Sequence, residues 1–247
     1  MNNGSSILAD LSNSGVLTIT INRPEKLNAL NFETVESLIA CFKKIDSDSS
    51  IKTAILRGAG QKAFSVGADL KELTSFSEDE KLEFFKKLGE LFKIGCALRK
   101  PLIAQVSGYA LAGGCGLAAL ADIIVSDKSG IFGLPELERG IAPAIILAPL
   151  SKILSEKTLN YLALSASKID AEEARQIGLV SILCEHKDLA GTTCQLAEKI
   201  ASFKHEAVTK AKDFLRQVKK MSIESYIDFA VKSISDLAQT SSNLKNF

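Results

Sequence analysis

The sequence is poor in the residues that build disulfide frameworks and metal centres. Its five cysteines are odd in number and include no C-x-x-C pair, so a disulfide or zinc framework is not indicated and reduced thiols, typical of the cytoplasm, are expected. The only two histidines, His186 and His205, lie among lysines and glutamates near the C-terminus. This scarcity argues against a Ser-His-Asp hydrolase, and we predict that the chain holds no metal.

The sequence also lacks an excess of charge of one sign and a signal peptide. Lys and Arg total 30 and Asp and Glu total 29, which indicates neither a nucleic-acid partner nor an anionic membrane surface. Residues 1–6 contain no basic and no apolar stretch, so a secretory signal is not predicted. The twenty uncharged residues Leu102–Ala121 are long enough to span a bilayer, but they include Gln105, Ser107 and four glycines. We therefore interpret this run as a buried strand, a glycine loop and a buried helix in series.

No linker rich in Pro, Gly or Ser divides the 247 residues, and no internal repeat is visible. Short apolar runs alternate with amphipathic stretches over about the first 145 residues, which predicts an α/β fold with right-handed crossovers. A capping box at Asp170 and Glu173 predicts a short helix that ends at Gly178. The expected strands are 7–11 and 16–21 (a hairpin), 52–57, 102–106, 122–126 and 180–184; the expected helices are 31–45, 77–99, 187–201, 205–219 and 222–239.

Several of the expected helices carry apolar residues at helical spacing, and these side chains are expected to be buried. They are Phe32, Val35, Leu38, Ile39, Phe42 and Ile45 in the first helix, Leu82, Phe85, Leu88 and Phe92 in the second, and Val208, Ala211, Leu215 and Val218 in the helix 205–219.

Two glycine-containing loops, 63–72 and 107–116, each follow an expected strand, and a helical segment is expected to begin just after each. The first N–H groups of a helix have no partner within the helix and lie at the positive end of its dipole. Two such loops at neighbouring strand ends are able to direct two backbone N–H groups at one point. This arrangement is typical of an oxyanion hole, which stabilises negative charge that develops on an oxygen atom.

A third element, Phe132–Glu136 (FGLPE), holds the carboxylate of Glu136 behind a proline in an apolar stretch. Burial would raise the pKa of this carboxylate toward the range useful for proton transfer. Taken alone, an acidic residue after a proline at a helix start is more often a partner of the helix dipole. Together with the two glycine loops, Glu136 becomes a candidate acid/base. Glu138 is a possible helper, or else a solvent-facing charge.

Five segments together resemble the crotonase superfamily (enoyl-CoA hydratase/isomerase). The resemblance implies an α/β fold in which residues 1–190 form a ClpP-like spiral of ββα units and residues 191–247 form a helical trimerisation region. It also implies a homo-oligomer, either a trimer or a dimer of trimers, and a CoA thioester as substrate, with coenzyme A as part of the substrate and no separate cofactor. The segments are Ile21–Leu30 (INRPEKLNAL), Phe64–Glu72 (FSVGADLKE), Gly108–Leu117 (GYALAGGCGL), Phe132–Glu136 and Ala171–Val180 (AEEARQIGLV).

The resemblance implies a role for each site residue. The N–H groups of Ala68 and Gly113 would hold the thioester oxygen as it becomes an enolate, and Glu136 would be the catalytic acid/base. Lys26 would lie near the adenosine end of the substrate, although a solvated surface lysine is the alternative there, as it is for Lys71. The implied substrate- and CoA-binding residues are Lys26, Ala29, Ala68, Asp69, Leu70, Lys71 and Gly113.

One departure from the family's pattern bears on the reaction. Hydratases of the well-known type use two glutamates, and the first of these falls at Gly116, which leaves Glu136 as the only acid/base. Isomerases that move a double bond between positions 3 and 2 of the acyl chain also work with one glutamate. Leu134–Ala144 (LPELERGIAPA) is similar to the same segment of hydratases of the methylglutaconyl-CoA type, which also have glycine at the position of Gly116. This similarity favours a single-glutamate hydratase. The isomerase and a catalytically inactive CoA-ester-binding scaffold are the alternatives.

A dinucleotide-binding oxidoreductase is a further reading of the same glycines. Gly114–Ala119 (GCGLAA) fits the pattern G-x-G-x-x-A. That fingerprint requires a strand that runs directly into its first glycine, and residues 107–113 separate the two here. We therefore do not expect an oxidoreductase.

Overall fold

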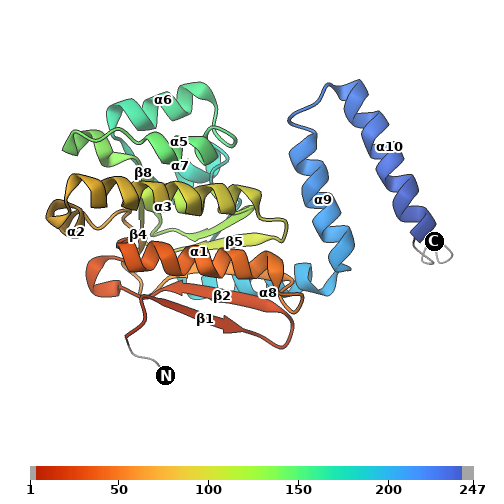
Figure 1. Cartoon of the computed structure of the whole chain (residues 1–247), viewed down its shortest axis with the longest axis horizontal. Helices are drawn as coiled ribbons and strands as arrows, with labels where there is room; N and C mark the ends of the chain where they lie inside the picture. Colours follow the sequence, from red (N-terminus) through yellow and green to blue (C-terminus); the bar gives the residue numbers. More distant parts are fainter. Residues whose placement is uncertain (1–3, 241–247) are drawn as a thin grey trace. The chain divides into compact units, whose positions relative to one another are not determined.

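The computed structural model describes residues 4–240, with side chains up to residue 234. The chain forms two compact units, Met1–Phe203 and Lys204–Phe247. The first contains two sheets and most of the helices (Figure 1). The second contains helices α9 (His205–Gln217) and α10 (Ile223–Thr240).

The larger sheet has six strands in the order β1-β2-β3-β5-β7-β10. Strands β1 and β2 form the predicted antiparallel hairpin with the predicted bounds, and every other neighbouring pair is parallel. The strands are β1 (Ile7–Leu11), β2 (Val16–Ile21), β3 (Thr53–Gly58), β5 (Leu102–Val106), β7 (Ile123–Asp127) and β10 (Ile182–Cys184).

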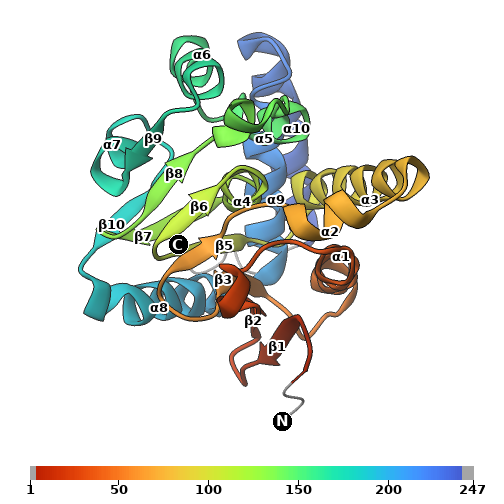
Figure 2. The ribbon, with the colours of Figure 1, turned by 90° about the vertical axis from the view of Figure 1, so that its left-hand side faces the viewer.

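Both faces of this sheet are covered by helices, which explains why its central strands are apolar on both sides. In β3, Ala54 and Leu56 belong to the core formed with α1 and α3, whereas Ile55 belongs to the smaller core under α8. Figure 2 shows the sheet between α1 and α8. Because α8 packs on β3, β5 and β7, it belongs to the first unit, so the helical C-terminal unit begins at Lys204 rather than at residue 191. These helices are α1 (Phe32–Ser47), α3 (Glu78–Ala97) and α8 (Leu189–Ser202).

The structure also contains a second sheet of four short strands, in the order β4-β6-β8-β9, whose individual strands are not among those expected from the residue pattern. The chain makes three successive turns, β3–β4, β5–β6 and β7–β8. Each turn adds its first strand to the larger sheet and its second strand to the smaller one, which is the ββα spiral that the resemblance implies. Each of these strands has three residues, too few to show an alternating pattern. They are β4 (Ala63–Ser65), β6 (Tyr109–Leu111), β8 (Ile131–Gly133) and β9 (Lys168–Asp170).

Shorter helices join the two sheets and cover their edges. The predicted capping box is confirmed: the Glu173 N–H donates to Asp170 Oδ1 at 2.8 Å, and the Asp170 N–H donates to Glu173 Oε2 at 3.1 Å. The remaining helices are α2 (Leu70–Ser75), α4 (Gly113–Ala118), α5 (Ala144–Leu150), α6 (Glu156–Ser165) and α7 (Ala171–Gln176), with 3-10 turns at Pro24–Lys26, Pro135–Arg139 and His186–Asp188.

One expected buried face is half confirmed, since Leu88 and Phe92 of α3 are buried, and another, that of α9, is wrong. In α3, Leu82 and Phe85 are 54% and 40% exposed, because the helix turns residues 84, 88, 91 and 92 toward the core. In α9, Leu215 and Val218 are 68% and 44% exposed. The apolar spacing of α9 therefore does not mark a buried face.

The uncharged run Leu102–Ala121 is mostly buried, as predicted, with Tyr109 as an exposed exception. It forms β5, β6 and α4, and all six residues of α4 are buried. Over the described part of the chain, no helix combines the length and apolar character that crossing a membrane requires.

Candidate active site

Three neighbouring strands of the small sheet lead directly into the candidate catalytic residues. Strands β4, β6 and β8 are parallel neighbours, so their carboxyl ends meet at one edge. Ala68 follows β4, Gly113 follows β6 and Glu136 follows β8, each within three residues of the strand end. Since adjacent strands lie about 4.8 Å apart, this edge brings the three residues together.

The backbone around Ala68 is held in one orientation by Leu30. The Leu30 N–H donates to Gly67 O at 2.8 Å, and Leu30 O accepts from the Asp69 N–H at 2.9 Å. A trans peptide directs its N–H opposite to its C=O, so the bond to Gly67 O turns the Ala68 N–H away from Leu30. Within residues 4–240, no acceptor is bound to the Ala68 N–H. It is an available donor.

Gly113 is the first residue of α4, where helix N–H groups have no intrahelical acceptor. The preceding Ala112 has φ 51° and ψ −128°, a conformation that alanine rarely adopts, and its N–H donates to Gly133 O at 2.9 Å. The Gly113 N–H binds no acceptor among the described residues. A methyl group on Gly113 would lie 3.8 Å from Ala68 N, so the two available donors are close neighbours.

The carboxylate of Glu136 is the acidic group at this edge. Its Oε2 atom is buried and has no hydrogen-bond partner among the described residues. Burial raises the pKa of Glu136 above its ordinary value, and a hydrogen bond to its own backbone opposes this only partly. A carboxylate oxygen that is buried and has no partner is suited to accept and return a proton.

A single pocket of about 640 Å³ joins these groups, and its lining residues include every site residue predicted from the sequence. The roles of these residues stay predictions, but their convergence is a finding. They are Lys26, Ala29, Ala68, Asp69, Leu70, Lys71, Gly113 and Glu136.

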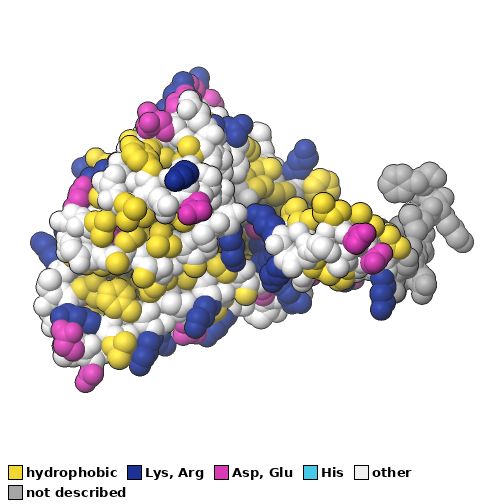
Figure 3. Space-filling model, turned by 90° about the horizontal axis from the view of Figure 1, so that it is seen from above, with side chains coloured by type: hydrophobic (Ala, Val, Ile, Leu, Met, Phe, Trp, Pro, Cys, Tyr) yellow, Lys and Arg dark blue, Asp and Glu magenta, His cyan; other side chains and the backbone are white. Residues whose placement is uncertain are grey.

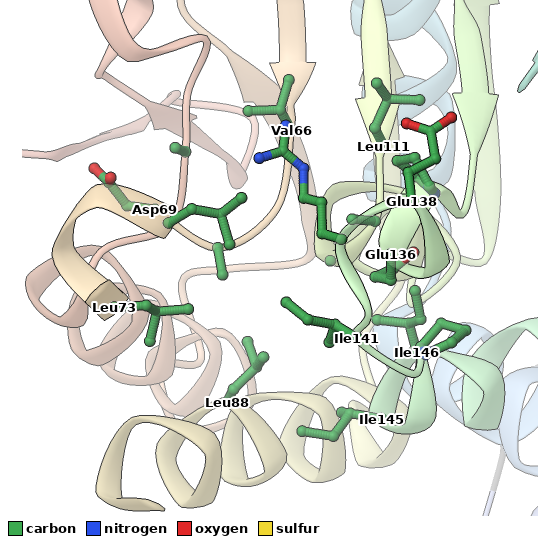
Figure 4. Close-up of a pocket in the computed structure, with 18 of the residues that line it drawn as sticks. Val66, Asp69, Leu73, Leu88, Leu111, Glu136, Glu138, Ile141, Ile145 and Ile146 are labelled. Carbon is green, nitrogen blue, oxygen red and sulfur yellow. The ribbon is translucent and has the colours of Figure 1, made fainter. Parts of the chain in front are cut away.

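Most of the remaining lining is apolar. It comes from α2, from α3 and from the segment that follows Glu136, and Figure 4 shows these side chains around the cavity. The sequence did not single them out as pocket residues, although Phe85 and Leu88 were predicted to be buried. They include Leu73, Phe85, Leu88, Ile141, Ile145 and Ile146.

Each side of the pocket carries a carboxylate beside a cation, and the two pairs differ in distance and exposure. Figure 4 shows Asp69 and Glu138 on opposite sides of the pocket. Asp69 is engaged by Arg23 at 2.9 Å; burial opposes its ionisation, but hydrogen bonds from Arg23 and from backbone N–H groups outweigh this, so the pKa of Asp69 lies below its ordinary value. At the other end, Glu138 is 4.0 Å from Lys168 and half exposed, which agrees with a solvent-facing charge. Arg139, which the sequence did not mark, also lines the pocket.

The interior beside Gly116 is closed. A methyl group at Gly116 would lie 2.6 Å from two carbons of Ile146 and 2.9 Å from a ring carbon of Phe92. No side chain fits there without movement of α5 or α3. The position at which two-glutamate hydratases have their first glutamate is therefore filled by the packing of Ile146.

Cys115 and Ser107, two other nucleophiles near the sheets, are not arranged for covalent catalysis. Burial raises the pKa of Cys115 to about 12, so this thiol is protonated at neutral pH. Ser107 Oγ and His186 Nδ1 both contact Asp127 Oδ2, at 2.8 and 2.5 Å. Asp127 thus lies between Ser107 and His186, whereas a hydrolase triad needs histidine in the middle.

The glycines of the G-x-G-x-x-A pattern serve packing instead. Gly114 and Gly116 lie inside α4, and a methyl group on Gly114 would lie 2.1 Å from Ser65 O. The sequence placed residues 107–113 between the preceding strand and this motif. In the structure the separation is shorter, because β6 ends at Leu111 and only residues 112 and 113 lie before Gly114. The close approach of α4 to β4 accounts for Gly114, and the packing of Ile146 and Phe92 accounts for Gly116, without a nucleotide.

Comparisons with known proteins agree with this geometry. A family model described as enoyl-CoA hydratase/isomerase matches residues 12–246. The chain is 34% identical over 226 residues to the short-chain-enoyl-CoA hydratase of Clostridium acetobutylicum, which covers 91% of this chain and 87% of that protein. It is 35% identical over 214 residues to the mitochondrial enoyl-CoA hydratase of Pongo abelii, and this match covers 85% of this chain and 72% of that protein. The crystal structure of an enoyl-CoA hydratase from Bacillus anthracis matches with a TM-score of 0.91 at 27% identity, over 97% of this chain and 93% of that one.

Proposed function

The chain belongs to the enoyl-CoA hydratase/isomerase family, and we propose that it adds water to a 2-enoyl-CoA with Glu136 as its single acid/base. The observation that carries this proposal is the buried, unpartnered Glu136 Oε2 in the pocket that Ala68 and Gly113 also line. The relatives named as enoyl-CoA hydratases support water addition as the reaction.

The proposed reaction needs one carboxylate and two N–H donors. Ionised Glu136 takes a proton from water while the water oxygen bonds to C3 of the acyl chain, and the C2–C3 π electrons move onto the thioester oxygen. The N–H groups of Ala68 and Gly113 hold this enolate, each contributing about 3 kcal/mol to the transition state. Protonated Glu136 then gives its proton to C2 on the same face, and the carboxylate is regenerated. Water is consumed and no electrons are exchanged, so we propose that no resident cofactor is needed.

The substrate is proposed to enter from the end of the pocket formed by Lys26, Ala29 and Lys71, with its coenzyme A moiety on that side. Leu70 and the backbone of Ala68 and Asp69 would follow the pantetheine arm. The apolar residues of α3 and of the segment after Glu136 would receive the acyl chain.

An isomerase that moves a double bond between positions 3 and 2 is the second candidate. The closed packing at Gly116 favours it, because isomerisation needs only one group to carry a proton from C2 to C4. The same enolate and the same N–H donors would serve both reactions. Only hydration changes the mass of the acyl-CoA.

The test is a panel of 2-enoyl- and 3-enoyl-CoA substrates given to the wild type, Glu136→Gln and Glu138→Gln. A hydratase adds the mass of one water to the 2-enoyl-CoA, and Glu136→Gln should remove turnover while acyl-CoA affinity stays nearly unchanged. Glu138→Gln should keep most of the activity. Equal losses in both variants would contradict a single carboxylate, and tight binding without turnover of any substrate by the wild type would favour the inactive scaffold.

We also propose that the protein is a homo-oligomer, a trimer or a dimer of trimers. Helix α10 exposes Ile223, Ile227, Val231 and Ile234 at helical spacing, between 53% and 80% exposed. Figure 3 shows hydrophobic side chains along this helical segment. An apolar stripe of this kind is typical of an interface. Light scattering should give three or six chains for the wild type and fewer for Ile227→Asp; a monomeric wild type would contradict the proposal.

A cytoplasmic location is proposed as well. The five cysteines are all free thiols, and reduced thiols are typical of that compartment. Cell fractionation tests it, and recovery outside the cytoplasm would contradict it.

A further inference from the structure

The two proposed N–H donors differ in how they are held. Gly113 belongs to α4, whose six residues are all buried. Ala68 lies in the connection between β4 and α2, residues 66–69, directly after Gly67, which has φ 83°. Because Ala68 belongs to neither a helix nor a strand, the orientation of its N–H depends on contacts that other segments make with this connection.

Those contacts come from the segment that contains Ala29 and Leu30. The pair of backbone bonds between Leu30 and residues 67 and 69 fixes the peptide planes on both sides of Ala68. The Ala68 N–H can keep its direction only as long as the two segments stay in register.

Arg23 joins the two segments. Its Nη1 donates to Ala29 O at 2.6 Å and its Nη2 donates to Asp69 Oδ2 at 2.9 Å, so one guanidinium holds both sides of the Leu30–Ala68 bridge. The side chains of Arg23 and Asp69 are only 15% and 12% exposed, a setting in which charge-assisted hydrogen bonds are strong and directional. Asp69 Oδ1 also accepts from the Glu72 N–H and so begins α2.

Arg23 is not among the residues that line the pocket, and the Asp69 carboxylate is already occupied. Neither charged group is therefore free to bind the substrate. We propose that Arg23 and Asp69 are positioning residues that orient the Ala68 N–H toward the thioester oxygen. This inference rests on the proposed function, because it assigns a task to the oxyanion donor of that site.

We call the ion pair of Arg23 with Asp69, together with the bond from Arg23 to Ala29 O, the clamp. Removal of the clamp should impair chemistry more than binding. Displacement of a catalytic group by about 1 Å can cost about 100-fold in rate, so we expect kcat to fall 10- to 100-fold in Arg23→Gln and in Asp69→Asn. The dissociation constant of butyryl-CoA, which has no double bond to react, should change less than about threefold, because the pocket walls stay in place. Arg23→Lys keeps the charge but cannot reach both acceptors with a planar fork, and it should recover only part of the rate.

The decisive readout is the infrared band of butyryl-CoA labelled with ¹³C at the thioester carbonyl. Hydrogen bonds to a carbonyl oxygen lower its stretching frequency, so the wild type should show a lowered band. Arg23→Gln and Asp69→Asn should show a band closer to that of free butyryl-CoA. If Arg23→Gln does not fold, as judged by circular dichroism, Asp69→Asn and Arg23→Lys provide the measurement.

The matched control is His186→Gln, which removes one side-chain partner of another buried aspartate, Asp127, away from the pocket. It should change neither kcat nor the carbonyl band. A wild type without a lowered band would overturn the oxyanion hole itself and thus the proposed function. A lowered band and a wild-type kcat in both clamp variants would overturn the positioning role alone.

Discussion

Substitution of Gly67 by alanine separates two consequences of one methyl group. Gly67 has φ 83°, so alanine would be strained there by about 1–2 kcal/mol. The added methyl would also lie 2.8 Å from Gly113 N and 3.0 Å from Ala112 Cβ, where it obstructs the second proposed oxyanion donor. Loss of one such donor lowers kcat about 100- to 1,000-fold.

Gly178 provides a matched control because it has nearly the same φ, 81°, but no atom within 4 Å of the position of the added methyl. Gly178→Ala should therefore carry the backbone strain alone. Both variants should lower the melting temperature by a few degrees, about 2–4 °C for each kcal/mol in a chain of this size. Only Gly67→Ala should lose turnover of enoyl-CoA, measured as the decrease of the enoyl-thioester absorbance.

The result that would refute this reasoning is a Gly67→Ala variant with the melting temperature of Gly178→Ala and a kcat within about threefold of the wild type. The donor at Gly113 would then be unnecessary. A loss of activity in both variants would instead show that strain alone disturbs the fold.

Two further predictions concern Glu136 and Gly116. Because burial raises the pKa of Glu136, kcat/KM should fall on acidification with a midpoint above the ordinary glutamate value of about 4.3, and an ordinary midpoint would contradict proton transfer by this group. The folded-state pKa exceeds the unfolded one, so ionised Glu136 destabilises the fold above that pKa; Glu136→Gln should raise the melting temperature near pH 8 but not near pH 4, and equal shifts at both would count against burial as the cause. Gly116→Ala should destabilise the protein by about 1–3 kcal/mol through overlap with Ile146, and an unchanged denaturation midpoint would show that α5 moves freely.

The elements that the sequence predicts well are those with many local constraints. The hairpin β1–β2 and the capping box at Asp170 depend on neighbouring residues, and both are confirmed. The individual strands of the small sheet could not be predicted from the residue pattern, because each has three residues and is specified by pairing with distant strands. The exposed position of Phe85 has a related cause: this apolar side chain faces the pocket rather than the core.

The same contrast applies to the site. The backbone donors and Glu136 lie in short motifs, so their positions along the chain indicate that they meet. The ion pair of Arg23 with Asp69 joins residues far apart in sequence, and no spacing rule predicts it. The filling of the space beside Gly116 depends on how closely α5 approaches α4, which only the packed structure reveals.

The adjacency of β4, β6 and β8 has a consequence for how this protein can vary. One residue advances a strand by about 3.3 Å, so an insertion or deletion in any of these three segments would slide one partner past the other two. Changes of length at the opposite ends of the same strands would leave the alignment intact. Natural and engineered length variation should therefore accumulate on one rim of the small sheet and spare the other.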